Sequence, residues 1–582
     1  MAASQYRHIT HSPGDLSHIV CKAASQGLIT FTARERQLCS DIDLAAFTAT
    51  HTRMTTAKPE HMPEHLRRRT FAIISHPDAG KTTLTEKLLM FGGAIQLAGE
   101  VRAKQGRRQT SSDWMKIERQ RGISVVTSVM TFEYGARIYN LLDTPGHEDF
   151  SDDTYRTLTA VDSAVMVIDA AKGIEARTKK LFEVCRLRDI PIITFINKMD
   201  RETRDPFDLM DEIEKTLALD ATAMTWPIGR GREFVGTYDL HKRFIRSNKT
   251  DIPDQPVSGP EDKVFDELLP HSVAEWRDEV MLAEGGMKPF EMAAFREGHL
   301  TPVYFGAALR DYGVRDLIEA IGTLAPPPRA QIAASRTVAA DEAKMTSFVF
   351  KIQANMDPNH RDRIAFVRVC SGKLTRGMKA KLVRTAKPMS LSAPQFFFAQ
   401  DRQIADEAYA GDIVGIPNHG SLRIGDTLTD GEDLVFRGVP SFAPEILRRV
   451  KLKDAMKSKK LREALQQMAE EGVVQLFVPH DGAPAIVGVV GALQLDVLKE
   501  RLEAEYAIPV DFETCQFTIC RWLTSPDAVA LDKFVDSHGS SMANDLDGDP
   551  VFMASSPFSL RYEAERAPAL VFSDIKDYQK AA

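Results

Sequence analysis

The sequence predicts a multidomain α/β protein with a parallel-sheet nucleotide-binding domain, then a β-barrel, then an α+β domain of ferredoxin-like layout. The chain has 582 residues, which is too long for one domain, and its 43% hydrophobic content supports packed cores. Strand and helix patterns alternate from residue 67 to residue 324, which indicates a parallel sheet with helices on both faces. Short β-rich runs and then amphipathic helices follow.

A phosphate-binding loop is the first functional element. The apolar run Thr70–Ser75 predicts a buried strand, and residues Lys81–Phe91 have helical periodicity. Between them, the sequence matches the pattern G-x-x-x-x-G-K-[ST], except that Ser75 replaces the first glycine. In such a loop the backbone N–H groups surround phosphates, Lys81 binds the outer phosphates, and the hydroxyl of Thr82 ligates magnesium. The alternative, an ordinary strand–turn–helix, does not account for the lysine and threonine at the start of the helix.

The second element follows the predicted strand Arg137–Leu142, which delivers Asp143. A carboxylate at the end of a strand is placed to hold magnesium, usually through water. The backbone N–H of Gly146 can bond a γ-phosphate, so this loop can distinguish a triphosphate from a diphosphate. His147 follows directly. Alone, Asp-Thr-Pro-Gly is an ordinary turn, and its meaning comes from the phosphate loop before it.

The third element reads the base. The predicted strand Pro191–Ile196 ends at Asn197-Lys-Met-Asp200. The carboxylate of Asp200 can accept from the N1–H and the amine of guanine, a donor pair that adenine lacks. Asn197 can reach the guanine edge, and the stem of Lys198 can pack on the ring.

A fourth, weaker element is Gly306-Ala-Ala308, which follows the apolar run Pro302–Phe305. Its backbone N–H groups are expected to donate to the guanine O6. The candidate GTP-binding residues are therefore Ser75, His76, Pro77, Asp78, Ala79, Gly80, Lys81, Thr82, Asp143, Thr144, Pro145, Gly146, His147, Asn197, Lys198, Met199, Asp200, Ala307 and Ala308. An ATP-using enzyme is disfavoured by Asn-Lys-x-Asp, and a binding protein without turnover is disfavoured by the presence of Lys81 and His147.

These residues resemble the translational GTPase family, which includes elongation factors Tu and G. The spelling Ser75-His-Pro-Asp-Ala-Gly-Lys-Thr, the segment Asp113–Ser124 and the segment Val489–Leu498 are most similar to the release-factor members. The similarity runs from about Arg67 to near the C-terminus. One departure is Ala307-Ala308, where the family commonly has Ser-Ala.

The resemblance implies roles for individual residues. His147 would position the attacking water, assisted by Lys81, while Asp78 would organise the charges around the transferred phosphoryl group; these are the candidate catalytic residues. The metal ligands would be Thr82, Ser124 and Asp143. Pro77 and Ile123 would form an apolar gate that holds His147 away from the nucleotide until the ribosome engages.

The resemblance also implies a function. The protein would be a ribosome-dependent GTPase of translation termination that stimulates dissociation of class-1 release factors after peptide release. Hydrolysis of GTP to GDP and phosphate would then release the protein itself. GTP, GDP and Mg²⁺ are the implied ligands, ribosomal RNA and proteins the partners, and a cytoplasmic monomer the expected state. The alternative is a translational GTPase of elongation or ribosome rescue, which the short tail after Arg521 disfavours.

Composition adds limits. The net charge of −7 does not by itself indicate a nucleic-acid-binding protein. Basic clusters lie at residues 102–108 and 448–462; alone they could be solvated faces, whereas the resemblance implies that they contact ribosomal RNA. The six cysteines show no Cys-x-x-Cys spacing, and Cys185 is expected to be a small buried residue. No apolar run reaches the ~18 residues of a membrane span.

The expected domain boundaries follow from these patterns. Residues 1–66 form an extension that is either loosely ordered or the result of a start assigned too far upstream, with Met54 and Met62 as alternative starts. Residues 67–324 form the GTP-binding domain, with an insertion at about 225–300, and proline-rich residues 325–339 form a linker. Residues 340–437 form the barrel and residues 438–582 the α+β domain. No repeat of fixed period is visible.

Overall fold

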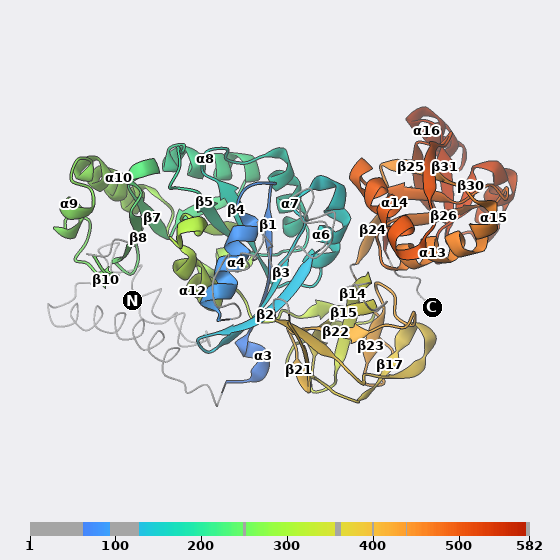
Figure 1. Ribbon diagram of the computed structural model, residues 1–582, viewed down its shortest axis with the longest axis horizontal. Coiled ribbons are helices and arrows are strands. Elements are labelled where there is room, and N and C mark those ends of the chain that lie inside the picture. The colour runs from blue at the N-terminus through green and yellow to red at the C-terminus, as the bar shows by residue number, and fades with distance from the viewer. Residues whose placement is uncertain are drawn as a thin grey trace, which may run out of the picture. The chain divides into compact units, whose positions relative to one another are not determined.

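The computed structural model describes residues 62–93, 127–247, 252–354, 363–398, 401–437 and 439–577. The expected N-terminal extension up to residue 61 and the segment Asp113–Ser124, with Ile123 and Ser124, lie outside these residues. Residues 64–582 belong to one unit. Within it we call residues 64–325 domain 1, residues 326–439 domain 2 and residues 440–577 domain 3 (Figure 1).

Domain 1 is built on a seven-stranded sheet in the order β2-β3-β1-β4-β5-β11-β6. All neighbouring strands are parallel except β2, which runs antiparallel to β3. The strands are β1 (Arg68–Ser75), β2 (Ser128–Tyr134), β3 (Arg137–Asp143), β4 (Ser163–Asp169), β5 (Ile192–Asn197), β6 (Asp220–Ala223) and β11 (Leu300–Phe305). Every residue of β1, β4, β5 and β11 is buried, as expected for strands covered on both faces.

Helices cover both faces of this sheet. Along β1, Phe71 and Ile73 pack with α4 and α12, whereas Ala72 and Ile74 pack in the cluster that contains α7 and α8. The helices are α3 (Glu64–Arg67), α4 (Lys81–Phe91), α6 (Ser151–Leu158), α7 (Ala176–Arg186), α8 (Pro206–Leu217) and α12 (Val314–Leu324), with the short 3₁₀ turns η2 (Glu148–Phe150) and η4 (Ala308–Arg310). Cys185 on α7 is buried, as predicted, and burial raises the pKa of its thiol to about 12.

The segment between β6 and β11 carries a small antiparallel sheet of its own, in the order β10-β9-β8-β7. The 3₁₀ turn η3 (Gly231–Glu233) connects β7 and β8. Trp226, Tyr238, Phe265 and Trp276 pack together at its core, with ring centroids of Phe265 and Trp276 4.3 Å apart. Its elements are β7 (Thr225–Ile228), β8 (Gly236–Asp239), β9 (Phe244–Ser247), β10 (Gln255–Pro256), α9 (Val264–Leu268), α10 (Val273–Gly286) and α11 (Met292–Arg296).

Domain 2 contains an eight-stranded sheet in the order β18-β17-β23-β14-β15-β22-β19-β20 and two small two-stranded sheets, β12-β13 and β16-β21, which confirms the predicted barrel-like β domain. Phe350, Phe366 and Phe397 form its aromatic core. Its strands are β12 (Gln331–Ile332), β13 (Thr337–Val338), β14 (Thr346–Ala354), β15 (Arg363–Ser371), β16 (Lys373–Thr375), β17 (Lys379–Leu382), β18 (Lys387–Ser390), β19 (Gln395–Phe398), β20 (Asp401–Ile404), β21 (Glu407–Tyr409), β22 (Ile413–Pro417) and β23 (Thr427–Thr429), with the 3₁₀ turn η5 (Val383–Thr385).

Domain 3 contains the β-α-β-β-α-β unit predicted from the sequence, and it contains this unit twice. The eight strands pair in the order β28-β25-β27-β26-β30-β31-β29-β32, so that the second unit has the strand order of the first in reverse and joins it through β26 and β30. The first unit is β25 (Ile446–Leu452), α13 (Ser458–Glu470), β26 (Gln475–Pro479), β27 (Ile486–Val489), α14 (Ala492–Tyr506) and β28 (Val510–Thr514). The second is β29 (Ile519–Thr524), α15 (Ala528–Ser537), β30 (Met542–Asn544), β31 (Pro550–Ala554), α16 (Pro557–Arg566) and β32 (Val571–Ser573). No pattern in the sequence predicted this duplication.

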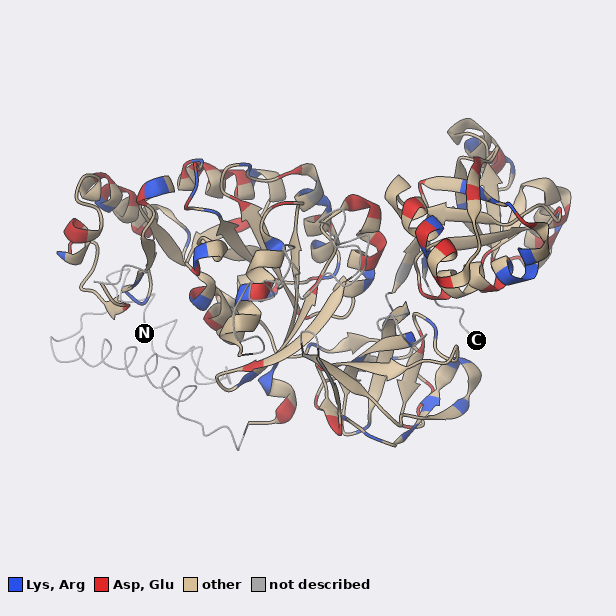
Figure 2. Cartoon of the chain, in the orientation of Figure 1, with Lys and Arg blue, Asp and Glu red and all other residues tan. Residues whose placement is uncertain are grey.

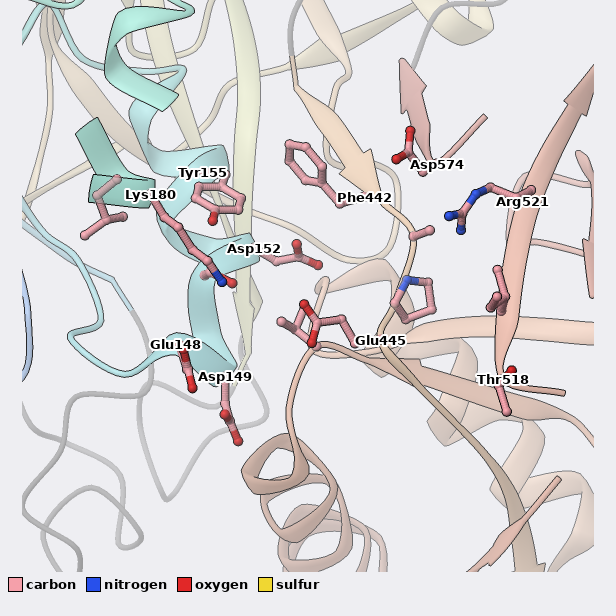
Figure 3. Close-up of a pocket in the computed structure, with 16 residues that line it drawn as sticks. Glu148, Asp149, Asp152, Tyr155, Lys180, Phe442, Glu445, Thr518, Arg521 and Asp574 are labelled. Atoms are coloured by element: carbon pink, nitrogen blue, oxygen red, sulfur yellow. The ribbon is translucent and has the colours of Figure 1, made fainter. Parts of the chain in front are cut away.

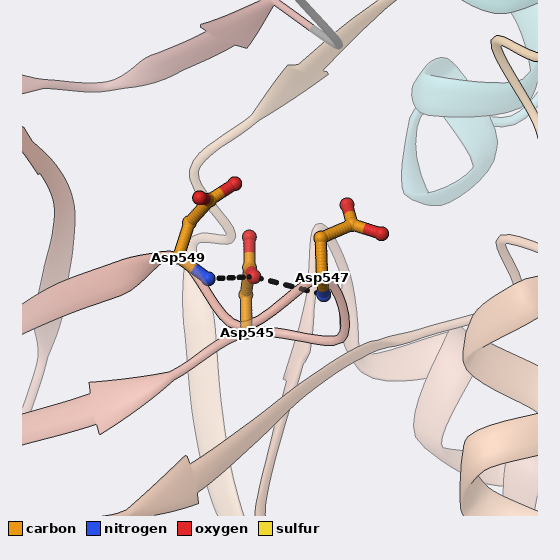
Figure 4. Close-up of side chains that lie close together, drawn as sticks. All are labelled: Asp545, Asp547 and Asp549. Atoms are coloured by element: carbon orange, nitrogen blue, oxygen red, sulfur yellow. Dashed lines mark hydrogen bonds between the residues drawn. The ribbon is translucent and has the colours of Figure 1, made fainter. Parts of the chain in front are cut away.

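Two further strands, β24 (Pro440–Phe442) and β33 (Ile575–Asp577), pair with each other and bring the two ends of domain 3 together. Lys576 on β33 reaches the turn between β30 and β31, where Asp545, Asp547 and Asp549 lie close together (Figure 4). Its Nζ lies 2.5 Å from Asp545 and 2.8 Å from each of the other two carboxylates. Lys576 therefore offsets part of the negative charge of this turn, and Arg423 of domain 2 adds a second cation at 3.3 Å from Asp547. None of the helices in the described ranges is long and apolar enough to cross a membrane.

A buried ion pair joins domain 1 to domain 2. The Arg368 guanidinium lies 2.6 Å from Asp162, and the two side chains are 1% and 0% exposed. Arg368 also donates to the carbonyl oxygens of Ala160 and Gly411, at 3.1 and 3.0 Å. A buried ion pair costs much free energy to break, because removal of one partner leaves the other charged and out of contact with water.

We predict that Arg368→Ala lowers the free energy of unfolding by about 3–5 kcal/mol, since it removes the ion-pair partner of the buried carboxylate of Asp162. The midpoint of urea-induced unfolding measures this change. The matched control is Arg376→Ala, because Arg376 pairs with Asp406 at 3.6 Å on the surface, where the side chains are 52% and 81% exposed. That control should change stability by less than about 1 kcal/mol. Equal shifts in the two variants would contradict the assigned importance of the buried pair.

Candidate functional site

The candidate site lies at the carboxyl edge of the parallel sheet in domain 1, where ligands of open α/β sheets bind. The strand register aligns the strand ends there: Ile73 is paired with Asp143, Asp169 with Asn197, and Phe305 with Ile196. The loops that follow β1, β3, β5 and β11 therefore meet, and these are the four segments that the sequence singled out.

The loop between β1 and α4 has the backbone needed to surround an anion. Asp78 and Gly80 both have positive φ, 66° and 95°, and α4 begins directly after Gly80. A Cβ at Gly80 would lie 2.4 Å from Nδ2 of Asn197, so glycine is required both for its conformation and for this close approach. Ser75, His76 and Ala79 are buried, whereas Pro77 and Asp78 are exposed at the rim.

Lys81 and Asp143 form a direct contact at the centre of the site. The Nζ of Lys81 is 2.5 Å from Oδ1 of Asp143, and the side chains are 7% and 1% exposed. Phosphate would compete for the ammonium group and a divalent cation for the carboxylate, so ligand binding exchanges this contact for two new ones. Asp143 and the half-buried Thr82 offer oxygen ligands, the type that Mg²⁺ prefers.

Asn197 holds two loops in place. Its Nδ2 donates to the carbonyl of Ala79 at 2.8 Å, and its Oδ1 accepts from the N–H of Ala308 at 2.9 Å. The sequence suggested that Asn197 reaches the guanine edge, but here both ends of its amide bond the protein backbone. Asn197 therefore connects the phosphate loop to the loop after β11.

The loop after β11 is held by hydrogen bonds within domain 1. The N–H groups of Gly306, Ala307 and Ala308 donate to Ile196, Tyr312 and Asn197 within domain 1. Gly306 continues the pairing of β11, and Ala307 closes a bridge to Tyr312. All three donors therefore bond acceptors of the protein in this structure, and their contact with the guanine O6 stays a prediction.

Sequence reasoning missed two charged partners of the base-reading segment. The Nζ of Lys198 lies 2.7 Å from Asp169, which ends β4 at the same sheet edge. Burial alone would raise the pKa of Asp169. The hydrogen bond from Lys198 outweighs this effect and holds the pKa below its ordinary value. The carboxylate of Asp200 lies 3.1 Å from Nε of Arg310 and is 8% exposed. The position of Asp169 at a parallel strand end was the available signal, whereas Arg310 had none.

His147 follows the Asp143 loop and begins the turn η2. Its Nδ1 accepts a hydrogen bond from the N–H of Asp149 at 3.3 Å, and the carboxylate of Asp149 lies 3.5 Å from the same nitrogen. The imidazole is 37% exposed, so it is accessible for chemistry. Gly146 lies beside Pro77, whose Cα would be 3.8 Å from a Cβ at that glycine. The loop that carries His147 thus meets the rim of the phosphate loop.

Helix α6, which continues from this loop, is attached to domains 2 and 3. Asp153 pairs with Lys351 of domain 2 at 2.8 Å. Arg156 donates to the carbonyl of Gly472 in domain 3 at 3.2 Å. The ring of Tyr155 packs edge-on against Phe442 of domain 3, with centroids 5.2 Å apart. A movement of the loop after β3 would therefore alter the contacts of α6 with both other domains.

The pKa values of the two carboxyl groups at the start of α6 are shifted in opposite directions. Burial raises the pKa of Asp152, an effect that Arg156 only partly offsets. Burial also acts on Asp153, but the Lys351 ammonium and the donors of Thr127 outweigh it and lower the pKa of that carboxyl. Asp153 therefore forms a charged link to domain 2.

A cavity of about 670 Å³ lies between α6 and domain 3 (Figure 3). Asp152 and Tyr155 line one side, and Phe442, Glu445 and Arg521 line the other. The contact of α6 with domain 3 is consequently incomplete, in contrast to the buried contact between domains 1 and 2.

Basic residues of the cluster at 448–462 mostly have partners within domain 3. Lys451 and Lys453 pair with Glu513 and Asp511, and Lys460 donates to the carbonyl of Tyr506 at the end of α14. Along the cartoon of domain 3, positions of Lys and Arg are interspersed with positions of Asp and Glu (Figure 2). The cluster is thus part of a charge-balanced surface.

Comparison with known proteins agrees with this geometry. The family model described as Elongation factor Tu GTP binding domain matches residues 66–327, Elongation factor G domain 2 matches residues 344–431, and Class II release factor RF3, C-terminal domain, matches residues 436–564. Peptide chain release factor 3 of Aromatoleum aromaticum is 49% identical over 533 residues, which cover 90% of this chain and 97% of that protein. A crystal structure of a protein from Thermus thermophilus shares the fold, with a TM-score of 0.63 at 23% identity over 82% of this chain and 72% of the other.

We predict that Asp200→Asn weakens GTP binding by about 100-fold, because two donors of the base lose their acceptor in a buried site. The amide should accommodate a carbonyl in place of the guanine amine, so that binding of xanthosine triphosphate improves. A competition titration with the two nucleotides measures both changes. Asp211→Asn is the control, since Asp211 lies on the exposed face of α8 and is 63% exposed. Unchanged affinity for GTP in Asp200→Asn would show that this carboxylate does not read the base.

Proposed function

The chain belongs to the peptide chain release factor 3 family, and from this premise we propose that it makes class-1 release factors dissociate from the ribosome after peptide release. Membership makes it a GTP-hydrolysing translational GTPase of termination. The observation that carries the proposal is the union in one chain of a GTP-binding domain with the C-terminal domain of release factors.

The proposed chemistry is the attack of water on the γ-phosphate of GTP, which yields GDP and inorganic phosphate. Mg²⁺ would be held by Thr82, Asp143 and Ser124, and it supplies positive charge that neutralises the phosphates. Lys81 would leave Asp143 and donate to the outer phosphate oxygens. The backbone of the loop from Ser75 to Gly80 would donate to the remaining oxygens.

His147 is the proposed water-positioning residue. Phosphoryl transfer needs mostly positioning and charge stabilisation. One oriented imidazole, together with Mg²⁺ and Lys81, is therefore sufficient for hydrolysis. Asp78, exposed on the rim of the phosphate loop, would arrange the surrounding charges. Pro77 would form one side of an apolar gate and Ile123 the other, so that His147 reaches the water only on the ribosome.

The proposed cycle uses GTP as a conformational ligand. A nucleotide can shift a ribosomal equilibrium only if the two nucleotide forms bind the two ribosome states with different affinity. The GTP form would favour the state from which class-1 factors leave, and hydrolysis would then release this protein. Since ribosomes are the proposed partner, we expect a monomer that acts in the cytoplasm without binding DNA.

The proposal is tested by the dissociation rate of a labelled class-1 release factor from post-termination ribosomes. The chain is added with GTP, with a non-hydrolysable analogue or with GDP. Acceleration by both triphosphate forms and not by GDP is expected. No acceleration, together with ribosome-stimulated GTP hydrolysis, would leave a translational GTPase that acts on another ribosomal complex.

We predict that His147→Ala lowers ribosome-stimulated hydrolysis by at least about 100-fold, because the attacking water loses its positioning group. The affinity for GTP should stay within about twofold of the original, since binding depends on the phosphate and base loops. Single-turnover hydrolysis and an equilibrium titration measure the two quantities. Wild-type turnover in this variant would remove His147 from the mechanism.

A further inference from the structure

The N-terminus of α14 in domain 3 is capped from domain 1. Helix α14 begins after Gly491, which has no side chain to accept a hydrogen bond from the first turn. Instead, the N–H of Leu493 donates to the carboxylate of Asp149 at 2.7 Å. Gln494 caps the chain just before the helix, since its Oε1 accepts from the N–H of Val490 at 2.7 Å. The acceptor for the helix start is therefore a carboxylate from the turn next to His147.

The duplicated unit of domain 3 provides an internal comparison. In both units one residue separates the second central strand from the N-cap of the following helix: Val490 before Gly491, and Ser555 before Ser556. At α16 the hydroxyl of Ser556 accepts from the N–H of Ser559 at 3.2 Å, so this helix caps itself. Of these two equivalent helices, α16 has a capping side chain of its own, whereas α14 has none and is capped by a side chain of domain 1.

Gly491 leaves the space that the carboxylate occupies. A Cβ at this position would lie 2.0 Å from Cγ of Asp149, which no real contact allows. The backbone does not require glycine for its conformation, because φ is −139° and ψ is 164°, an extended geometry open to any residue. Glycine is thus needed for the approach of Asp149 and not for the path of the chain.

Asp149 also contacts His147. Its backbone N–H donates to Nδ1 of the imidazole, and its carboxylate lies 3.5 Å from the same atom. One carboxylate therefore lies between the imidazole proposed to position water and the positive end of a helix in domain 3. A movement of domain 3 relative to domain 1 must displace Asp149 or break its bond to α14.

We propose that Asp149 is a positioning residue that links the orientation of His147 to the position of domain 3 through the N-terminus of α14. The inference rests on the proposed function of His147 and adds the route by which the ribosome, acting on domain 3, controls it. In the intact protein a shift of α14 moves Asp149 and with it the imidazole. Without the contact, domain 3 moves and His147 does not follow.

The test measures kcat and KM for ribosome-stimulated GTP hydrolysis in four variants: Asp149→Ala, Asp149→Asn, Gly491→Ser and the double variant Asp149→Ala/Gly491→Ser. Gly491→Ser copies the self-capping residue of α16 and displaces the carboxylate of Asp149, so that α14 stays capped while the link is broken. Gly539→Ala is the control, because a Cβ there meets no atom within 4 Å. Thermal unfolding of each variant reports the stability of the fold.

Gly491→Ser and Asp149→Ala are expected to lower kcat about tenfold or more with KM for GTP unchanged, since a misplacement of about 1 Å costs up to 100-fold in rate. Asp149→Asn should keep most of the rate, because its amide oxygen can accept from Leu493. The double variant should regain thermal stability but not rate. Gly539→Ala should behave as the original chain.

A purely structural role gives a different result. Gly491→Ser would then hydrolyse GTP at the original rate, and the double variant would regain rate together with stability; either result overturns the inference. Failure of the proposed function looks different again, since the unmodified chain would then leave the dissociation rate of class-1 release factors unchanged. Failure of the proposed role of His147 would appear as wild-type turnover in His147→Ala.

Discussion

The attachment of α6 of domain 1 to both other domains is the constraint on which the rest of this structure depends. The helix begins a few residues after Asp143 and His147, so its position is tied to the loop that we propose senses the nucleotide. Asp153 fixes it to domain 2 and Arg156 to domain 3. Because these contacts involve buried charged groups, they are directional and cannot slide continuously. We therefore expect nucleotide-dependent changes at the sheet edge to reach the other domains as discrete changes of domain contact.

The two interfaces of domain 1 differ in a way that assigns them different roles. Domain 2 is held by the fully buried ion pair of Arg368 and Asp162. The guanidinium also donates to two carbonyl oxygens, and the loss of these hydrogen bonds would add to the free-energy cost of separating domains 1 and 2. Domain 3 contacts domain 1 through the cap of α14, the hydrogen bonds of Arg156 and Asp152, and one ring contact, beside a cavity of about 670 Å³. It contacts domain 2 through ion pairs of Arg363 with Glu470 and Glu471 and of Arg423 with Asp547. We infer that domains 1 and 2 move together and that domain 3 is the one that changes position.

Much of this could be predicted from the sequence, because the signals are local. The helix predicted at Lys81–Phe91 has those bounds, and the strands before the phosphate loop and before Asn197 lie within one or two residues of expectation. What could not be predicted depends on contacts across long separations: Arg310 beside Asp200, and Asp149 at α14. No signal in the sequence indicated that Asn197 and Ala308 bond each other, and their predicted contacts with the base stay predictions. The duplication in domain 3 is one of topology, since similar strand and helix order does not require similar residues.

The most direct measurement is the distance between domains 1 and 3 in each nucleotide state, from spin labels at Leu187 and Met456. Both positions are highly exposed, 85% and 93%, so labels there should not disturb packing. A distance distribution that shifts between GDP and a non-hydrolysable GTP analogue, with labels on domains 1 and 2 showing no shift, is expected if α6 relays the nucleotide state to domain 3. Identical distributions in both nucleotide states, on and off the ribosome, would contradict that relay.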